Sequence, residues 1–347
     1  MIIVMRAITA KQMAMAAALC LLPVMAQAAT LKVTTVNDEL DAKCDQHCSL
    51  RDALRVAVQG DTIILPAGSF SPAQQGEFRI KNNVNMMGAG IGQTILDGKK
   101  AKRLLHVHPG FQATLSGITF QNGTSQESGG CLVNAGNLTI QDSQFLNCDT
   151  AKSGGAIMNR GTLKVINTPF NGNQAKELGG AIEQAGDALT LIHATFENNS
   201  AAKGGAVHTA YGNAVLKQTQ MAKNSALEQG GGIWSGSGKT VGIEATTIQG
   251  NAAPAGADCL GVLIFTGNTN ILGDPKGCTT LGAATKKAPP IKVPTIERTL
   301  KPSGIGGTRM QPAAPVKKTV PLPSSIKIEK PILPKGIGGG VPKPRKP

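Results

Sequence analysis

The sequence repeats itself between residues 120 and 251, and this repeat limits the folds that the chain can adopt. One signature is a glycine pair followed by small and apolar residues, and the other is a large apolar residue three positions before an asparagine. The large apolar residue recurs at steps of 25, 25, 26, 25 and 27 residues, at Phe120, Phe145, Phe170, Phe196, Met221 and Ile248. A fixed period of this size is typical of stacked supersecondary units.

Each repeat contains short alternating strands and no helical pattern. Residues 138–140, 163–165 and 189–191 alternate apolar and polar side chains between turn residues, which favours strands over helices. A unit with three short strands and no helix predicts one coil of a parallel β-helix, with coils stacked about 4.8 Å apart. We therefore expect an all-β fold, a right-handed parallel β-helix solenoid over residues 61–280.

Stacking would place equivalent residues in columns. The large apolar residues form one column, and a second holds Leu132, Ile157, Ile182, Val207 and Ile233. An asparagine ladder is expected at a turn, from Asn173, Asn199, Asn224 and Asn251. The glycine pairs, at 129–130, 154–155, 179–180, 204–205 and 231–232, would supply a positive φ or room for close backbone approach at a corner.

Residues 1–28 have the pattern of a signal peptide. Arg6 and Lys11 precede an apolar run from 13 to 25, and Ala26-Gln27-Ala28 is typical of a cleavage site. The run is too short for a membrane-spanning helix. The sequence thus predicts an exported, soluble protein that is secreted or associated with the cell surface or outer membrane, with the periplasm as another possible location.

The net charge of +14 is concentrated outside the repeat region. Residues 286–347 hold 14 Lys and Arg against Glu297 and Glu329, whereas residues 29–285 contain equal numbers of basic and acidic residues. The same C-terminal stretch holds 13 of the 20 prolines, a composition that cannot bury a core. We expect residues 281–347 to be a disordered, basic, proline-rich tail that meets anionic partners.

Six cysteines remain after the signal segment, and an even number in an exported chain suggests disulfides. Cys44–Cys48 and Cys259–Cys278 are the local pairs. Cys131 lies in the column of the alanines that follow the glycine pairs, and Cys148 lies in the asparagine column, which makes Cys131–Cys148 a third pair. A zinc site at Cys44 and Cys48 with His47 is an alternative that lacks a second ligand pair nearby.

Residues 29–60 are expected to form an N-terminal strand and a capping helix. Ser49 with Asp52 three residues later suggests a capping box, and Leu50, Ala53 and Leu54 would form one apolar helical face. A solenoid needs such a cover over its first layer.

Two family resemblances support this organisation. Cys-Ser-Leu-Arg-Asp-Ala-Leu at 48–54 resembles the CSLREA motif that opens a family of exported right-handed β-helix proteins with a pectin-lyase-like fold, and segments 61–68 and 88–98 are similar to that family's early coils. The Gly-Gly-Ala-Ile and Phe-x-x-Asn repeats resemble those of polymorphic outer-membrane proteins. These resemblances imply the fold and export, but no particular chemistry.

Candidate catalytic residues lie in the columns whose side chains would point outward. Glu183, His208 and Trp234 would lie on adjacent layers, as an acid, a base and a sugar-stacking ring, or as three unrelated solvent-facing residues. Trp234 and Tyr211 are candidate glycan contacts. Asp258 and Asp274, near the closing turn, are candidate metal ligands or turn-capping carboxylates. A second column holds only one carboxylate, in the series Asp142, Asn167, His193 and Gln218.

The sequence therefore favours a non-catalytic exported β-helix protein, a monomer without cofactor or metal, for adhesion or cell-envelope interaction. Its basic tail would bind envelope polysaccharide or another anionic surface, with a host or neighbouring-cell surface as a further partner. No nucleic acid is expected, because the tail lacks aromatic residues for stacking on bases. The alternatives are a polysaccharide lyase or glycoside hydrolase that uses Glu183 and His208, and a tail that docks in a proline-binding groove.

Overall fold

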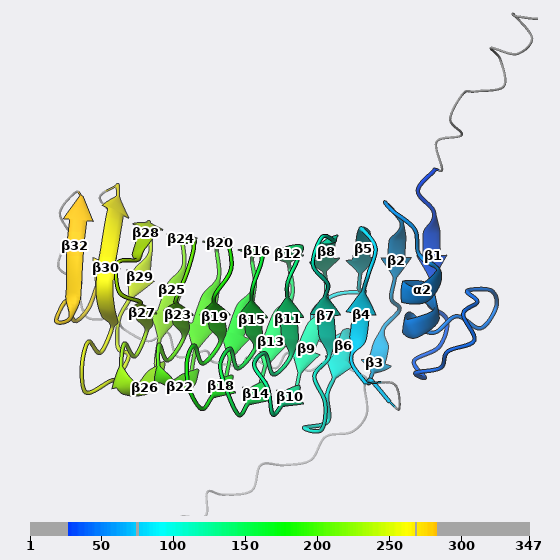
Figure 1. Cartoon of the computed structure of the whole chain (residues 1–347), viewed down its shortest axis with the longest axis horizontal. Coiled ribbons are helices and arrows are strands. Elements are labelled where there is room, and N and C mark those ends of the chain that lie inside the picture. The colour runs from blue at the N-terminus through cyan, green and yellow to red at the C-terminus, as the bar shows by residue number, and fades with distance from the viewer. Residues whose placement is uncertain (1–26, 74–75, 268, 283–347) are drawn as a thin grey trace, which may run out of the picture. The chain divides into compact units, whose positions relative to one another are not determined.

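The computed structural model describes residues 27–73, 76–267 and 269–282, and these form a parallel β-solenoid (Figure 1). The predicted signal segment up to residue 26 and the predicted tail from residue 283 lie outside the described residues. The chain coils around one apolar core, and every pairing between strands of neighbouring coils is parallel. The predicted all-β solenoid is therefore confirmed.

The strands form three walls, which we call A, B and C, and a fourth narrow row, strip D. Wall A contains β1 Thr30–Lys32, β2 Thr62–Ile64, β5 Val84–Met87, β8 Gln112–Ser116, β12 Asn137–Gln141, β16 Thr162–Ile166, β20 Ala188–Ile192, β24 Asn213–Lys217, β28 Thr240–Glu244, β30 Cys259–Thr266 and β32 Cys278–Gly282. Wall B contains β3 Gly68–Phe70, β6 Thr94–Asp97, β9 Thr119–Gln121, β13 Gln144–Leu146, β17 Pro169–Asn171, β21 Thr195–Glu197, β25 Gln220–Ala222, β29 Thr247–Ile248 and β31 Ile271–Leu272.

Wall C contains β4 Phe78–Ile80, β7 Leu105–Val107, β11 Leu132–Asn134, β15 Ile157–Asn159, β19 Ile182–Gln184, β23 Val207–Thr209 and β27 Ile233–Ser235. Strip D contains β10 Thr124–Ser125, β14 Asp149–Thr150, β18 Gln174–Ala175, β22 Ser200–Lys203 and β26 Ser225–Gln229. The long strand β30 pairs with both β27 and β28, so it joins walls A and C at the last coils.

The predicted columns are present in the register of wall B. Phe145 pairs with Phe120 and with Phe170, and Phe170 pairs with Phe196. Their rings are fully buried and stacked, with successive centroids 4.6, 4.9 and 4.7 Å apart. Met221 and Ile248 continue the column in the next two coils. The repeated apolar position is thus a continuous spine of the core.

The asparagine ladder also forms, and it ends on an acid. Asn173 donates from Nδ2 to Oδ1 of Asn199 at 2.9 Å, and the same bond links Asn224 to Asn251 at 2.8 Å. Asn251 then donates from its backbone N–H and its Nδ2 to Oδ1 of Asp258, at 3.0 and 2.8 Å. Buried amides and corner N–H groups therefore satisfy one another from coil to coil.

A central coil contains four strands, not the three that the sequence predicted. The extra strands are those of strip D, which lie between the asparagine corner and the glycine pair. The last glycine pair is also one residue earlier than predicted. The N–H of Ala206 bonds to the carbonyl of Gly232, which places Gly232 in the alanine column and makes Gly230 and Gly231 the pair.

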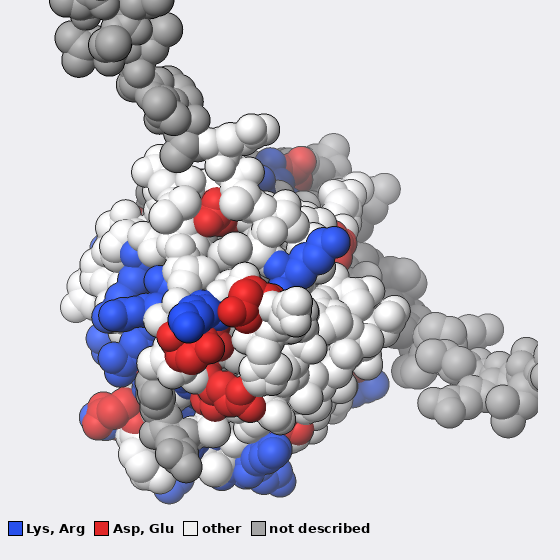
Figure 2. Space-filling view, turned by 90° about the vertical axis from the view of Figure 1, so that its right-hand side faces the viewer, with Lys and Arg blue, Asp and Glu red and all other residues white. Residues whose placement is uncertain are grey.

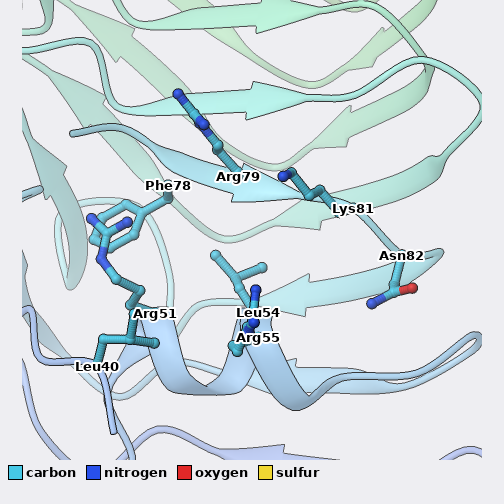
Figure 3. A pocket seen from close by; sticks show the side chains of 8 residues that line it. All are labelled: Leu40, Arg51, Leu54, Arg55, Phe78, Arg79, Lys81 and Asn82. Atoms are coloured by element: carbon cyan, nitrogen blue, oxygen red, sulfur yellow. The ribbon is translucent and has the colours of Figure 1, made fainter. Parts of the chain in front are cut away.

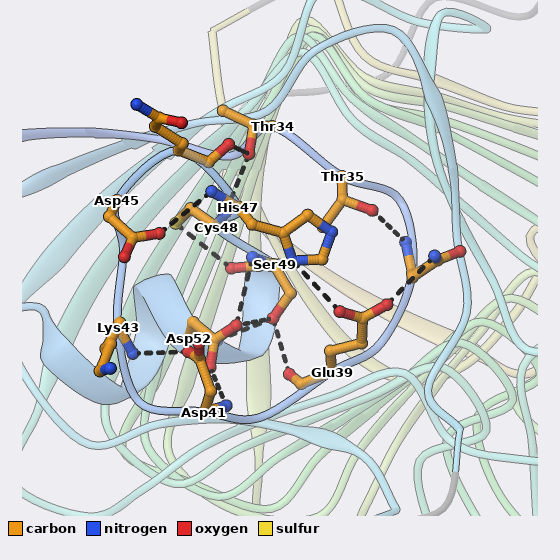
Figure 4. Close-up of polar contacts among 12 residues, drawn as sticks. Thr34, Thr35, Glu39, Asp41, Lys43, Asp45, His47, Cys48, Ser49 and Asp52 are labelled. Atoms are coloured by element: carbon orange, nitrogen blue, oxygen red, sulfur yellow. Dashed lines mark hydrogen bonds and ion pairs between the residues drawn. The ribbon is translucent and has the colours of Figure 1, made fainter.

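The predicted capping helix is α2, Leu50–Val56. Ser49 caps it: its Oγ accepts from the backbone N–H of Asp52 at 3.0 Å, and its own N–H donates to Oδ2 of Asp52 at 3.3 Å (Figure 4). Oδ1 of Asp52 accepts the N–H groups of Asp41 and Ala42, so this buried acid also holds the loop before the helix. Leu50, Ala53 and Leu54 are buried in the core.

The structure contains the three expected disulfides. Cys44–Cys48, Cys131–Cys148 and Cys259–Cys278 have Cα atoms 4.3, 5.5 and 5.6 Å apart. Because Cys44 and Cys48 bond to each other, they are not thiolate ligands, and the zinc alternative for this pair is wrong.

Candidate functional site

Wall C brings Glu183, His208 and Trp234 together on three successive coils. Glu183 of β19 pairs in register with His208 of β23, which pairs with Trp234 of β27. Nδ1 of His208 lies 2.7 Å from Oε2 of Glu183, and the His208 ring stacks on the Trp234 ring with centroids 4.2 Å apart. The column of an acid, a base and an aromatic ring is therefore a contact cluster.

The acid and the base of this cluster do not face solvent, contrary to the expectation for an outward column, whereas Trp234 is half-buried. The side chains of Glu183 and His208 are each only 4 % exposed. Val133 and Met158, which precede them in the same column, are also buried. The outward side of wall C is therefore covered at these four positions, from β11 to β23.

The cover is the chain between strip D and wall C. A Cβ on Gly204, whose φ is +66°, would lie 2.9 Å from the Cβ of His208 and 2.7 Å from the carbonyl oxygen of Val207. Only a glycine permits this approach in that backbone conformation. Lys203 of β22, next to this corner, places Nζ 5.1 Å from the centroid of the Trp234 ring.

The two buried side chains are hydrogen-bonded to each other. The Glu183–His208 hydrogen bond uses the carboxylate and one ring nitrogen, and Trp234 covers the imidazole face. Lys203 beside Trp234 is also ion-paired with Glu228 at 3.3 Å. A polysaccharide would need an open face to bring its glycosidic bond within hydrogen-bond reach of this pair.

Tyr211 and Trp234 do not form one aromatic patch. Tyr211 is 63 % exposed and lies near Lys239, whose Nζ is 5.8 Å from its ring centroid. Trp234 instead contacts His208 and Lys203. The two rings have different partners, and no stacking contact joins them within the described part of the chain.

The residues of the second outward column lie at a backbone corner and do not form a cluster of charges. Asp142, Asn167, His193 and Gln218 all have a left-handed backbone, with φ of 47°, 47°, 52° and 49°. Asn167 donates from Nδ2 to Oδ1 of Asp142 at 3.0 Å. Asn and Asp tolerate this conformation better than most residues, which explains part of the column's composition.

The two acids near the closing turn act as caps. Oδ2 of Asp258 accepts the N–H of Asp274 at 2.6 Å, in addition to the end of the asparagine ladder on Oδ1. Oδ1 of Asp274 accepts the N–H of Lys276 at 3.0 Å. No group of three or more His, Cys, Asp or Glu side chains in the described residues is arranged to hold a metal ion.

The seven-residue α2, the one helix in the described ranges, is too short to cross a membrane.

A charged cluster near the N-terminal coils was missed by the sequence analysis. Glu77 receives a hydrogen bond from Nη1 of Arg103 at 2.8 Å and lies 3.4 Å from Nδ1 of His106. Burial raises the pKa of Glu77, but the hydrogen bonds to His106 and Arg103 outweigh it and lower the pKa to about 2. Glu77 is thus a permanently charged acid at neutral pH.

Neighbouring cations extend this cluster outward. Arg79 of β4 pairs in register with His106 of β7, and His106 stacks on His108 with centroids 4.4 Å apart. Burial, together with the charges of His106, Lys81 and Arg79, lowers the pKa of His108. The alternation of Arg79, Ile80 and Lys81 is the sequence signal that places two cations on one side of a strand.

Comparison with known proteins finds a similarity within one coil of the solenoid. No curated protein and no solved structure gives a significant match to the chain. Residues 193–210 match the model described as the Chlamydia polymorphic membrane protein (Chlamydia_PMP) repeat. The matched segment contains both signatures, Phe196 to Asn199 and the glycine pair at 204–205. This coil of the β-solenoid is therefore similar to a polymorphic membrane protein repeat.

Proposed function

We propose that this chain is an exported, surface-associated β-solenoid that binds envelope or cell-surface material and performs no catalysis there. The observation that carries the proposal is the burial of Glu183 and His208 beneath the glycine corner. The acid–base pair then stabilises the wall and does not act on a ligand. The similarity of residues 193–210 to a polymorphic membrane protein repeat supports a place at the cell surface.

Two features of the sequence support export and attachment. Residues 1–28 have the signal-peptide pattern, and residues 48–54 resemble the CSLREA motif of exported β-helix proteins. Attachment is assigned to the tail from residue 286, because its 14 Lys and Arg carry nearly all the excess positive charge. Electrostatic attraction of such a segment to anionic polysaccharide weakens as salt screens the charges.

The test compares three forms of the mature chain for binding to isolated cell envelopes over a range of salt concentrations. These forms are the full chain, a chain without residues 286–347, and a full-length chain in which the 14 tail Lys and Arg are replaced by Gln. We expect the first to bind in a salt-sensitive manner and the other two to lose binding, with unchanged far-ultraviolet circular dichroism.

The glutamine variant separates charge from proline content. Binding that survives in this variant but is lost on deletion would support the alternative in which a partner docks on the prolines. Binding that is unchanged by deletion would overturn the proposed role of the tail. Both variants keep residues 29–285 intact, so a change in binding reports on the tail.

A further inference from the structure

A basic cleft of about 340 Å³ lies between α2 and β4 (Figure 3). Four cations line it, Arg51 and Arg55 from the helix and Arg79 and Lys81 from β4 and its end, together with Leu54 and Phe78. Figure 2, which looks onto this end of the solenoid, shows Lys and Arg side chains gathered at one side and bordered by acidic residues. None of the sequence-predicted sites includes this cleft.

One of the four cations is fully engaged by the fold. Arg51 donates from Nε and Nη2 to the two carboxylate oxygens of Asp38, at 2.6 and 2.8 Å. It also bonds to the carbonyl of Gly76 at 2.7 Å and lies 5.0 Å from the centroid of the Phe78 ring. These contacts therefore hold Arg51 rigidly at the edge of the cleft, and Asp38 neutralises its charge.

The other three cations are available to a ligand. Arg55 and Lys81 are exposed and have no ion-pair partner among the described residues. Arg79 is 54 % exposed and lies 3.5 Å from Glu77, but that carboxylate is already bonded to Arg103 at 2.8 Å. The cleft thus presents an excess of positive charge that the surrounding acids do not cancel.

We propose that this cleft binds the carboxylate group of an acidic oligosaccharide. Arg55, Arg79 and Lys81 would hold the carboxylate, since charge-assisted hydrogen bonds to guanidinium and ammonium groups are the strong ones. The apolar side chain of Leu40, which lines the cleft and is 42 % exposed, offers a surface for the C–H face of a sugar ring. Asn82 donates from Nδ2 to the carbonyl of Ala57 at 2.7 Å, which leaves its Oδ1 to accept a sugar hydroxyl.

The shape of the site favours a sugar over a lipid surface. The cations line a concave space at the lower end of the size of small-ligand pockets, about 300–1,000 Å³. A sugar residue at the end of a chain fits such a space, whereas a bilayer meets protruding side chains on a flat or convex surface. This ligand site lies in the solenoid body and is independent of the tail-mediated attachment proposed above.

The test uses isothermal titration calorimetry on the full-length chain whose tail cations are replaced by Gln, so that the tail cannot bind the probe. The probe is a trimer of galacturonic acid, and the reference is the neutral galactose trimer. We expect the acidic trimer alone to bind, and the double substitution Arg79→Gln with Lys81→Gln to weaken binding by at least about tenfold through loss of charged hydrogen bonds.

A matched pair of substitutions controls for total charge. Lys164→Gln with Lys176→Gln removes two exposed lysines away from the cleft and should leave the affinity unchanged. Arg55→Gln, on the helix side, provides a second variant of the site. The thermal midpoint of each variant should match the parent, because all these side chains are exposed.

Several outcomes would overturn the proposal. One is equal binding of the acidic and neutral trimers, or no binding of either. Another is a loss of affinity in the control pair as large as in the cleft pair. Binding to phosphatidylglycerol vesicles without binding to the acidic trimer would assign the cleft to lipid and reject the sugar ligand.

Discussion

Asn199 donates both its backbone N–H and its side-chain Nδ2 to the same oxygen, Oδ1 of Asn224, at 3.1 and 2.9 Å. Its own Oδ1 accepts the same two donors from Asn173, at 3.0 and 2.9 Å. Asn199 therefore donates two hydrogen bonds to the asparagine of the next coil and accepts two from the asparagine of the preceding coil. This coupling ties the corner of one layer to the next, in addition to the strand pairing.

Asn199→Ala should destabilise the solenoid strongly, because it leaves the buried backbone N–H of Asn173 without its acceptor and removes the bonds from Nδ2 of Asn199 to Asn224 and to the carbonyl of Phe170. An unsatisfied buried group costs about 1–3 kcal/mol, so the substitution should lower the free energy of unfolding by at least about 2 kcal/mol. Urea unfolding followed by circular dichroism measures this. Asn171→Ala, at an exposed position one coil earlier, should change stability by less than about 0.5 kcal/mol. Similar effects of the two substitutions would contradict the ladder's role.

The Cys131–Cys148 disulfide occupies the two columns that later coils fill with Ala and Asn. Replacing both cysteines by Ala should cost about 3 kcal/mol, as expected for the loss of a crosslink of this loop length. Cys131→Ala with Cys148→Asn should be more stable than the double Ala variant by about 1 kcal/mol, because an asparagine there adds a rung to the ladder above Asn173. Equal unfolding midpoints of the two variants would contradict this assignment of the columns.

Phe170 lies between two stacked rings, those of Phe145 and Phe196. Phe170→Ala should lower the free energy of unfolding by about 3–5 kcal/mol through loss of buried area and the cavity that it leaves. Phe170→Leu should cost less, since the same column accepts Met221 and Ile248 two and three coils later. Chemical denaturation measures the free energy of unfolding of both variants. An equal loss in the Leu and Ala variants would contradict the expectation that this column accepts aliphatic side chains.

Glu77 should make stability depend on acid pH. Its pKa is lowered from 4.5 to about 2 in the folded chain, so its stabilising contacts with Arg103 and His106 are present above about pH 4.5 and are lost as the pH falls toward 2. The measurement is the unfolding midpoint between pH 6 and pH 2. Glu77→Gln should reduce the slope in this window, and a slope that is unchanged would show that other acids determine it.

The fold was predictable because its main signals recur at a fixed period. The Phe column and the asparagine ladder follow from placing residues about 25 positions apart in contact. The Cys131–Cys148 pair, 17 positions apart, follows from the neighbouring columns that its two members occupy. Strip D was not predictable in the same way. Its first strands, β10, β14 and β18, have two residues each, and alternation cannot be recognised over so short a length.

The sequence predicted which residues of the candidate site meet, but it did not predict that Glu183 and His208 are buried. The spacing places Glu183, His208 and Trp234 on adjacent layers, and the structure brings them into contact. The burial of Glu183 and His208 did not follow from the spacing, which does not show that the corner at Gly204 packs against the Cβ of His208. The cluster around Glu77 joins residues of coils that lack the regular repeat, such as Arg103 and His106, so no column predicted it.

The most direct test of the central claim, a binding scaffold without catalysis, is an activity assay on the full chain. The protein is incubated with a panel of acidic and neutral polysaccharides, and unsaturated and reducing ends are measured over time. We predict no product above a heat-inactivated control. Product that forms with the native chain and disappears with Glu183→Gln, in a variant that retains the native circular dichroism spectrum, would contradict it.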